Sequence, residues 1–347
     1  MSGAGETATN PADAGYILVK GDQGLGNRIL CLLSATLLAR LTGRRLVVDW
    51  RDPLYSADGS DAFSRLLRHD LAVPLEALPE ASSIRPPTWR GRLHEPASVL
   101  RRERFGARGS AGDWSWEPFC TDLDRIDHRE RVLVFTSFFE TIAPLRRHMT
   151  GDLAGLRALS TATVLRRLWS DHLSLAPALE DRVNEFRRTR FAAETLGVHV
   201  RATDRRTRIR AVEARATRIA RRHPHIRVFL STDNGEELRR WGARFGDVIS
   251  TEKWYPPPGA AMHTHGDRPD PTAGAADALV DLHLLAACDR LIVDSRSSFG
   301  RLAALRSRAA PANVIDVHPG RFAPIGLRHA LRRLAHRATR PFRSRTS

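Results

Sequence analysis

A short segment near the middle of the chain ends in side chains that can hold a phosphate group. The segment Leu196-Gly-Val-His-Val-Arg-Ala-Thr-Asp204 begins apolar and then presents His199, Arg201 and Asp204. His199 and Arg201 alternate with valines, so on a strand both would lie on one face near its carboxyl end. Open α/β sheets bind their ligands at that end. A guanidinium there can stabilise, without a metal, the charge that builds on a β-phosphate when a sugar leaves a nucleoside diphosphate. The pattern indicates a nucleotide-sugar enzyme, with a strand-end histidine beside a surface arginine as the plain alternative.

Two further segments carry polar side chains that suit a nucleotide. Asp281 lies inside the apolar run 279–285, where a carboxylate is costly unless it is paired or held for a partner. A carboxylate that accepts from N1–H and the 2-amino group is the usual way to recognise guanine, although Asp281 could also lie on an exposed stripe. The turn Ser295-Arg-Ser-Ser298 precedes a predicted helix and offers hydroxyls, backbone N–H groups and a helix N-terminus to phosphate. Simple N-capping would explain the same serines.

A glycine-rich turn, Gly21-Asp-Gln-Gly-Leu-Gly-Asn-Arg28, joins a predicted strand to a predicted helix near the N-terminus. Its glycines let the backbone approach a ligand or a neighbouring strand closely. The spacing fits neither a dinucleotide fingerprint nor a phosphate-binding loop, which needs Gly-Lys-Ser/Thr. A tight structural turn and a ligand-facing helix N-terminus both explain it. In the second case the following residues would line a cleft between donor and acceptor: Gly24, Gly26, Asn27 and Arg28.

Alternating strands and helices would position these segments. In the first half, strands are predicted at 16–20, 45–49 and 131–135, and residues 145–190 show helical periodicity. Residues 28–41 are apolar nearly all round, which predicts a helix buried against the sheet and closed by Gly43.

A second run of such elements begins at Phe191. Strands are predicted at 195–200, 227–231, 247–250 and 291–294, with helices between them that end near Arg222, reach Phe245 and cover 276–287. Residues 232–234 are natural N-cap residues for the second of these helices. The loop 251–274 is of the kind that covers a ligand. Strands that alternate with helices predict an α/β fold with parallel sheets, and 347 residues suit two domains separable between 150 and 190.

The composition argues against several other classes of protein. The formal net charge of +16 comes almost wholly from arginine, because the chain has only two lysines, Lys20 and Lys253. That bias looks like a GC-rich coding sequence, so we expect no nucleic-acid partner. No run of about 18 apolar residues and no signal peptide are apparent, which predicts a cytoplasmic protein without membrane insertion. The three cysteines, Cys31, Cys120 and Cys288, match neither a disulfide framework nor a zinc site.

The blocks resemble the nodulation fucosyltransferases and, more distantly, the core α1,6-fucosyltransferases and the protein O-fucosyltransferases. Three blocks match in order, at 197–204, 228–233 and 278–288 with the serine-rich turn that follows. The glycine-rich turn and residues 42–51 also look like the nodulation enzyme. The resemblance runs from about residue 16 to 320, and it is loose over 52–190.

The resemblance implies a GT-B architecture, with two facing Rossmann-like domains and parallel sheets. We accordingly predict a disordered N-terminus at 1–14, an acceptor-side domain at 15–185, a nucleotide-sugar-binding domain at 186–325 and a basic tail at 326–347. It also implies an inverting, metal-independent transfer from a GDP-linked sugar, typically L-fucose, to a hydroxyl of a small molecule or glycan. No cofactor is implied.

The same resemblance assigns roles to residues of this chain. His199 and Asp281 would hold the guanine, and Arg201 the β-phosphate. The diphosphate would lie against Ser297 and its neighbours Arg296 and Ser298, and Asp233 falls in a block that matters for the family's activity.

The chain departs from the core fucosyltransferases at three positions. Ala202 replaces a second Arg, Asn234 a second Asp, and Ile209 the Glu favoured as catalytic base. Catalysis would then rest on leaving-group stabilisation by Arg201, with a weak base or none. The candidate bases are Asp22, Asp204 and Glu213.

Two other functions remain open from the sequence. The first keeps the fold and uses another donor, a UDP- or GDP-hexose, to modify a small natural product or nucleoside. The second is a non-catalytic protein that binds anions or RNA on the same sheet, and it would show steep salt dependence and no preference among mononucleotides.

Overall fold

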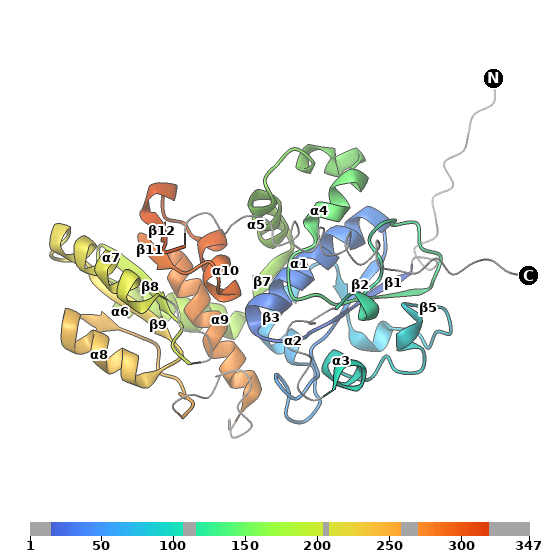
Figure 1. Cartoon of the computed structure of the whole chain (residues 1–347), viewed down its shortest axis with the longest axis horizontal. Coiled ribbons are helices and arrows are strands. Elements are labelled where there is room, and N and C mark those ends of the chain that lie inside the picture. Colours follow the sequence, from blue (N-terminus) through green and yellow to red (C-terminus); the bar gives the residue numbers. More distant parts are fainter. Residues whose placement is uncertain (1–14, 107–115, 204–207, 258–269, 319–347) are drawn as a thin grey trace, which may run out of the picture.

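The computed structural model describes residues 15–106, 116–203, 208–257 and 270–318, which form two halves side by side (Figure 1). The N-terminal half contains a five-stranded parallel sheet in the order β4-β2-β1-β6-β5. Its strands are β1 (Tyr16–Lys20), β2 (Arg45–Asp49), β4 (Ala72–Val73), β5 (Ile84–Arg85) and β6 (Val132–Phe135).

The C-terminal half contains a second five-stranded parallel sheet, in the order β10-β9-β8-β11-β12. Its strands are β8 (Thr195–Val200), β9 (Arg227–Thr232), β10 (Val248–Ile249), β11 (Arg290–Val293) and β12 (Val314–Asp316). All six residues of β8 are buried, which accounts for its nearly continuous apolar sequence. The expected α/β class with parallel sheets is confirmed.

Helices cover both sheets. They are α1 (Leu25–Thr42), α2 (Ala62–Leu66), α3 (Ala97–Phe105), α4 (Ile142–Leu145), α5 (Thr161–His172), α6 (Pro177–Arg190), α7 (Ile209–Arg222), α8 (Gly235–Phe245), α9 (Pro271–Ala287) and α10 (Ser298–Arg306). Short 3-10 helices lie at Leu75–Ala77, Pro87–Trp89, Glu117–Phe119, Arg146–His148, Gly151–Leu156 and Pro311–Asn313.

Helix α1 is the buried helix that the apolar segment after the glycine-rich turn predicts. It packs on β1 and β2 and contacts α5 and α10 on other faces. Gly43 ends it with φ of 65°, a left-handed conformation that favours glycine. Among the described residues it is the one helix long and apolar enough to cross a membrane, yet 78% of it is buried inside the fold. This burial is what a core helix between two layers requires.

Helix α9 begins five residues before the predicted start at residue 276. Asp270 is its N-cap, and the carboxylate accepts hydrogen bonds from the backbone N–H groups of Thr272 and Ala273. Pro271 occupies the first turn, where its missing N–H costs nothing. The loop predicted at 251–274 therefore extends too far, because α9 already begins at Pro271. Residues 258–269 of this loop lie outside the described part of the chain.

The segment 145–190 has helical periodicity, yet within it the chain passes from the N-terminal half to the C-terminal half. Strand β7 (Leu173–Leu175) interrupts it and pairs antiparallel with β3 (Leu67–His69) in the N-terminal half. Helix α6 follows and packs against α9, and the ring of Phe186 lies 5.6 Å from that of Phe229 in β9. By packing, α6 belongs with the C-terminal half, although the expected boundary between 185 and 186 cuts through it.

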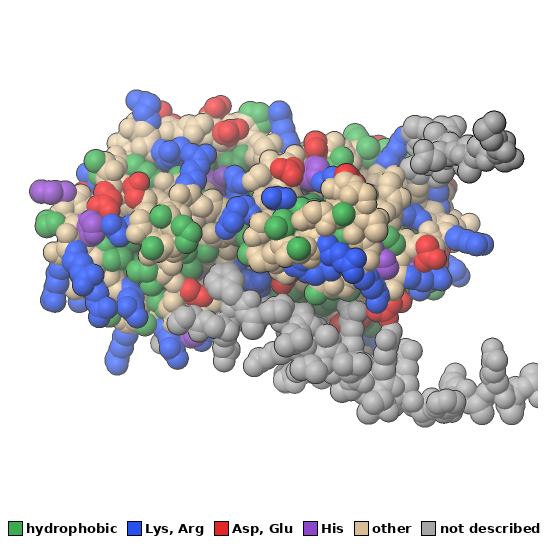
Figure 2. All heavy atoms as spheres, turned by 90° about the horizontal axis from the view of Figure 1, so that it is seen from above, with side chains coloured by type: hydrophobic (Ala, Val, Ile, Leu, Met, Phe, Trp, Pro, Cys, Tyr) green, Lys and Arg blue, Asp and Glu red, His purple; other side chains and the backbone are tan. Residues whose placement is uncertain are grey.

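The apolar core runs from one half into the other. One cluster of buried side chains includes residues of α1, α5, α9 and α10 together with parts of both sheets. The three cysteines are buried and none of them forms a disulfide among the described residues. Basic side chains are spread over the face in Figure 2 among acidic ones. The expected segments 1–14 and 326–347 lie outside the described residues.

Candidate active site

A cleft lies between the two halves, at the carboxyl ends of their central strands. Its lining from the N-terminal half is Gly24, Leu25, Gly26, Leu54 and Tyr55. Its lining from the C-terminal half is His199, Arg201, Ser231, Thr232, Asp233, Lys253, Pro271, Gly274, Ala275, Ala278, Asp281, Ser297, Ser298 and Phe299. Most of these residues come from the blocks in which the sequence predicts a nucleotide-sugar site.

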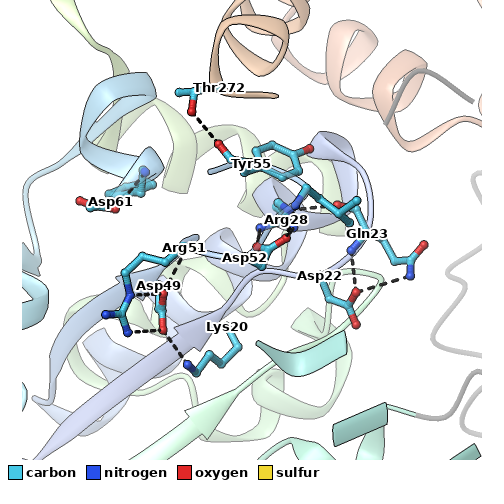
Figure 3. Close-up of polar contacts among 12 residues, drawn as sticks. Lys20, Asp22, Gln23, Arg28, Asp49, Arg51, Asp52, Tyr55, Asp61 and Thr272 are labelled. Atoms are coloured by element: carbon cyan, nitrogen blue, oxygen red, sulfur yellow. Dashed lines mark hydrogen bonds and ion pairs between the residues drawn. The ribbon is translucent and has the colours of Figure 1, made fainter. Parts of the chain in front are cut away.

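Two polar contacts join the halves beside this cleft. The hydroxyl of Thr272 donates a hydrogen bond of 2.7 Å to the backbone oxygen of Tyr55 (Figure 3). The guanidinium of Arg301, in α10, lies 3.2 Å from the carboxylate of Glu140 in the segment after β6. Both contacts are largely buried, so they hold the two edges of the cleft in place.

The N-termini of α1 and α10 meet in the cleft. A Cβ atom on Gly26 would lie 2.6 Å from the Ser298 hydroxyl and 2.8 Å from the backbone nitrogen of Phe299. Only glycine permits this approach. Gly24, the N-cap of α1, supplies no side-chain cap, and Ser297 caps α10 by accepting from the backbone of Gly300. Two helix N-termini that converge in this way favour an anion.

His199 and Arg201 reach the cleft from the end of β8, as their alternation along the strand predicts. The His199 side chain is buried against the Phe299 ring, with 5.1 Å between ring centroids. Its Nδ1 has no hydrogen-bond partner among the described residues. Burial lowers the pKa of His199 to about 4, so the ring is neutral at pH 7. Arg201 is partly exposed and lines the same cleft.

Asp281 projects from α9 into the cleft and is held by the protein itself. Its Oδ2 accepts from the hydroxyl of Ser231 at 2.8 Å and from the ammonium of Lys253. Its Oδ1 accepts from the hydroxyl of Thr251 at 2.5 Å. The buried acid that the sequence shows inside an apolar helix is thus a paired acid, and its partners come from β9 and from the segment after β10.

Asp233 supports the loop that follows β8. Its carboxylate accepts from the backbone N–H of Ala202 at 2.7 Å and from the hydroxyl of Thr203 at 2.6 Å. Both oxygens therefore tie the end of β9 to the residues next to Arg201. The neighbouring Asn234 caps α8, as predicted, by accepting from the backbone of Glu236 and Glu237. Asp233 lines the cleft and also positions the loop next to Arg201.

In the N-terminal half, the two charged residues of the glycine-rich turn, Asp22 and Arg28, each bind other groups of the protein (Figure 3). Arg28 is fully buried and makes a bidentate pair with Asp52, at 2.7 and 2.8 Å. Its guanidinium also lies 3.7 Å from the centre of the Tyr55 ring. Arg28 thus fixes the turn, and it does not line the cleft.

Asp22, the candidate base in this turn, is buried and lies outside the cleft lining. It accepts from the backbone N–H of Gln23 at 2.8 Å and pairs with Arg101 at 3.1 Å. Burial raises the pKa of Asp22, and Arg101 opposes that rise. Gln23 has φ of 61°, a strained conformation for a residue other than glycine. The turn is therefore held tightly just before the N-terminus of α1.

The structure separates the predicted site residues into three groups. Those that line the cleft are Gly24, Gly26, His199, Arg201, Asp233, Asp281, Ser297 and Ser298. Those outside its lining are Asp22, Asn27, Arg28 and Arg296. Asp204 lies outside the described residues.

Like Asp22 and Arg28, two further candidates outside the lining have partners elsewhere. The guanidinium of Arg296 pairs with Asp294 at 2.8 Å. Glu213, a further candidate base, pairs with Arg240 on the helix α7 side of the C-terminal half. Within the described ranges, no group of three or more His, Cys, Asp or Glu side chains comes together to hold a metal ion.

Sequence reasoning did not single out Tyr55 and Lys253, which line the cleft, or Thr251, whose hydroxyl donates to Asp281. For Lys253 a signal existed, because it is one of only two lysines in a chain that otherwise uses arginine for positive charge. Thr251 and Tyr55 lie in loops without a recognisable pattern.

Comparison with known proteins gives matches at the level of structure. No protein-family model matches the chain, and no curated protein matches it by sequence. The crystal structure of the α-1,6-fucosyltransferase NodZ soaked with GDP-fucose superposes with a TM-score of 0.55 at 20% identity, over 85% of this chain and 93% of that one. A mutant of Arabidopsis thaliana FUT1 in complex with GDP gives a TM-score of 0.51 at 16% identity, over 87% and 70% of the two chains.

A third solved structure, the apo form of POFUT1, gives a TM-score of 0.51 at 12% identity and covers 89% of this chain and 99% of that one. At identities this low, the matches show similarity of fold alone. The two parallel sheets, the cleft between their carboxyl ends and these likenesses together show that the chain has the GT-B fold of the fucosyltransferases.

Proposed function

We propose that this protein is an inverting glycosyltransferase that moves a sugar, L-fucose, from GDP to an acceptor hydroxyl without a metal ion. The observation that carries the proposal is the convergence of Arg201, His199 and two helix N-termini on one cleft between the halves. This arrangement offers positive charge and hydrogen-bond donors where a nucleoside diphosphate would lie. Structures similar to this chain hold GDP-fucose or GDP, which supports the choice of nucleotide.

Arg201 stabilises the leaving group in the proposed chemistry. As the bond between sugar and diphosphate breaks, negative charge grows on the β-phosphate, and a fixed guanidinium stabilises it more than it stabilises the ground state. The N-termini of α1 and α10 add fixed partial positive charge at the same edge. Asp233 holds the backbone of Ala202, so the loop that carries Arg201 keeps its direction.

His199 and Asp281 would lie against the base in this proposal. The neutral His199 ring lines the cleft beside Phe299, and Asp281 contributes a buried carboxylate. The acceptor, a small molecule or glycan, would approach from the side of Leu54 and Tyr55. Asp22 and Asp204 stay the candidate bases, with Asp22 needing to part from Arg101 to act. A cytoplasmic location is part of the same proposal.

A thermal-shift titration with GDP, UDP, dTDP and their sugar conjugates, with and without EDTA, tests the donor. A nucleotide at one hundred times its dissociation constant adds about 2.7 kcal/mol to the free energy of unfolding. We expect GDP and GDP-fucose to stabilise the protein equally with and without EDTA. A preference for UDP or dTDP would overturn the donor and keep the fold, whereas no response to any nucleotide would favour a non-catalytic protein.

The stereochemical outcome tests inversion. When the purified protein hydrolyses or transfers from GDP-β-L-fucose, NMR taken before mutarotation should show the α-configured product first. Initial appearance of the β-configured product would exclude an inverting reaction.

A further inference from the structure

The chain's two lysines are both buried, and each is paired with an aspartate at the carboxyl end of a sheet. Lys20 pairs with Asp49 in the N-terminal half, with side chains 2% and 5% exposed. Lys253 pairs with Asp281 in the C-terminal half, with side chains 4% and 2% exposed. Only Lys253 lines the cleft. The chain has 55 lysines and arginines, and all but these two are arginines. We therefore looked for a role at each position that a lysine fills better than an arginine.

The hydrogen bonds of Asp281 limit what it can offer a ligand. A carboxylate has about four lone-pair sites on its two oxygens. Ser231 and Lys253 occupy both sites of Oδ2, and Thr251 occupies one site of Oδ1. Among the described residues, nothing occupies the remaining site on Oδ1. A carboxylate that reads both N1–H and the 2-amino group of guanine needs two sites that face the base, and this one has fewer.

Lys253 supplies hydrogen-bond donors, which the carboxylate lacks. An ammonium has three N–H donors, and the contact with Asp281 uses one of them. A compact ammonium can direct the other two without the planar fork that a guanidinium imposes. Burial acts against the charged form, and the Asp281 carboxylate outweighs it and raises the pKa of Lys253. The side chain is therefore a charged donor held at a defined point of the cleft.

We propose that Lys253 is a specificity residue that reads the nucleotide base. Its ammonium donates to the O6 atom of guanine, Oδ1 of Asp281 accepts from N1–H, and the 2-amino group is left unread. This inference rests on the proposed function, because it concerns the base of the same donor. Its distinctive consequence is tolerance of hypoxanthine, which keeps O6 and N1–H and lacks the 2-amino group.

Isothermal titration of the unmodified protein with GDP and with inosine diphosphate (IDP) tests this consequence and needs no variant. We expect the two dissociation constants to agree within about threefold, because neither molecule loses a contact. A carboxylate that read the 2-amino group would weaken IDP by about tenfold or more, since a hydrogen bond to a charged group contributes about 1.5–3 kcal/mol. That result would overturn the inference and leave the proposed function standing. If no guanine or hypoxanthine nucleotide bound at all, the proposed function and the inference would both be wrong.

The variant Lys253→Met supplies the second test. It should weaken GDP about tenfold because a donor to O6 is lost. It also returns a lone-pair site on Oδ2 of Asp281, so that the 2-amino group gains an acceptor and the preference for GDP over IDP rises to about tenfold. An unchanged GDP affinity and an unchanged ratio would overturn the inference.

The matched control is Lys20→Met, which removes the other buried lysine from a site outside the cleft. Its ratio of GDP to IDP affinity should equal that of the unmodified protein within about twofold. A control variant that altered the ratio as Lys253→Met does would trace the effect to loss of any buried ion pair and overturn the inference.

Discussion

The two sheets have nearly the same strand order, but the residues near the carboxyl ends of their strands have different roles. Counted along the chain, the C-terminal sheet has the order 3-2-1-4-5, and the N-terminal sheet differs in that its last two strands are exchanged. At the carboxyl ends of the N-terminal strands, Lys20 binds Asp49 and Arg28 binds Asp52. At the matching ends of the C-terminal strands, His199 and Arg201 face the cleft.

The difference indicates that, in the proposed function, one half positions the cleft and the other contacts the ligand. Buried pairs in the N-terminal half hold the glycine-rich turn, so that Gly24 and Gly26 reach the cleft as backbone. The C-terminal half brings side chains instead, among them those of His199 and Arg201. Substitutions in the first half should therefore lower stability, and substitutions in the second should lower turnover or binding.

The largest expected effect is on stability in the N-terminal half. Arg28→Met leaves the Asp52 carboxylate buried without its bidentate partner, which should cost about 3–5 kcal/mol. Denaturant unfolding followed by circular dichroism measures the loss. Arg182→Met removes a half-exposed guanidinium from Asp277 and should cost less than about 1 kcal/mol. Equal losses in the two variants would contradict the positioning role of Arg28.

The next effect is on turnover in the C-terminal half. Arg201→Ala should lower kcat by about a hundredfold or more, because it removes a donor to the developing phosphate charge. The melting temperature should stay close to that of the unmodified protein. The control Arg210→Ala removes an exposed guanidinium from α7 and should leave kcat unchanged. A fully active Arg201→Ala would show that the assigned geometry is wrong.

A smaller effect is expected on the pH dependence of stability. The pKa of His199 is lowered from 6.5 to about 4 in the folded protein, chiefly by burial. Between these values the unfolded chain binds the extra proton, so stability falls as the pH falls from 6.5 towards 4. For one histidine the loss reaches about 2 kcal/mol at pH 5.

The variant His199→Gln isolates this contribution. His69 and His283 also have a pKa lowered to about 4, and both remain in the variant. Urea unfolding at pH 7, 6 and 5 should show a shallower decline for His199→Gln than for the unmodified protein. Parallel declines would mean that His199 is protonated in the folded state near its ordinary pKa.

The smallest effect is expected at Arg296. The resemblance to fucosyltransferases assigns it to the diphosphate, whereas the structure pairs it with Asp294 outside the lining of the cleft. Arg296→Ala should therefore change GDP affinity and kcat by no more than about twofold, because the guanidinium does not line the cleft. A loss of tenfold or more in GDP affinity would return Arg296 to the donor site.

Much of the fold could be predicted from local patterns. Residues 16–20 form β1 with the predicted bounds, and Gly43 ends α1, because apolar runs and a left-handed glycine are signals carried by neighbouring residues. The start of α9 could not be predicted from periodicity, since Thr272 to Ala275 are small residues without an apolar stripe. Strand β7 was hidden inside a helical pattern, because it forms only by pairing with β3.

The site was predictable to a similar extent. By itself, the sequence determined the residue types at the strand ends and turns, so that His199, Arg201, Asp281 and the serine-rich turn could be singled out. The tertiary structure decided which of them share a cleft, because the approach of α1 to α10 depends on contacts between distant segments. It also decided that Arg28 pairs with Asp52, Asp22 with Arg101, and Lys253 with Asp281. A charged side chain in a protein interior takes the partner that folding brings within reach, and the local sequence does not contain that partner.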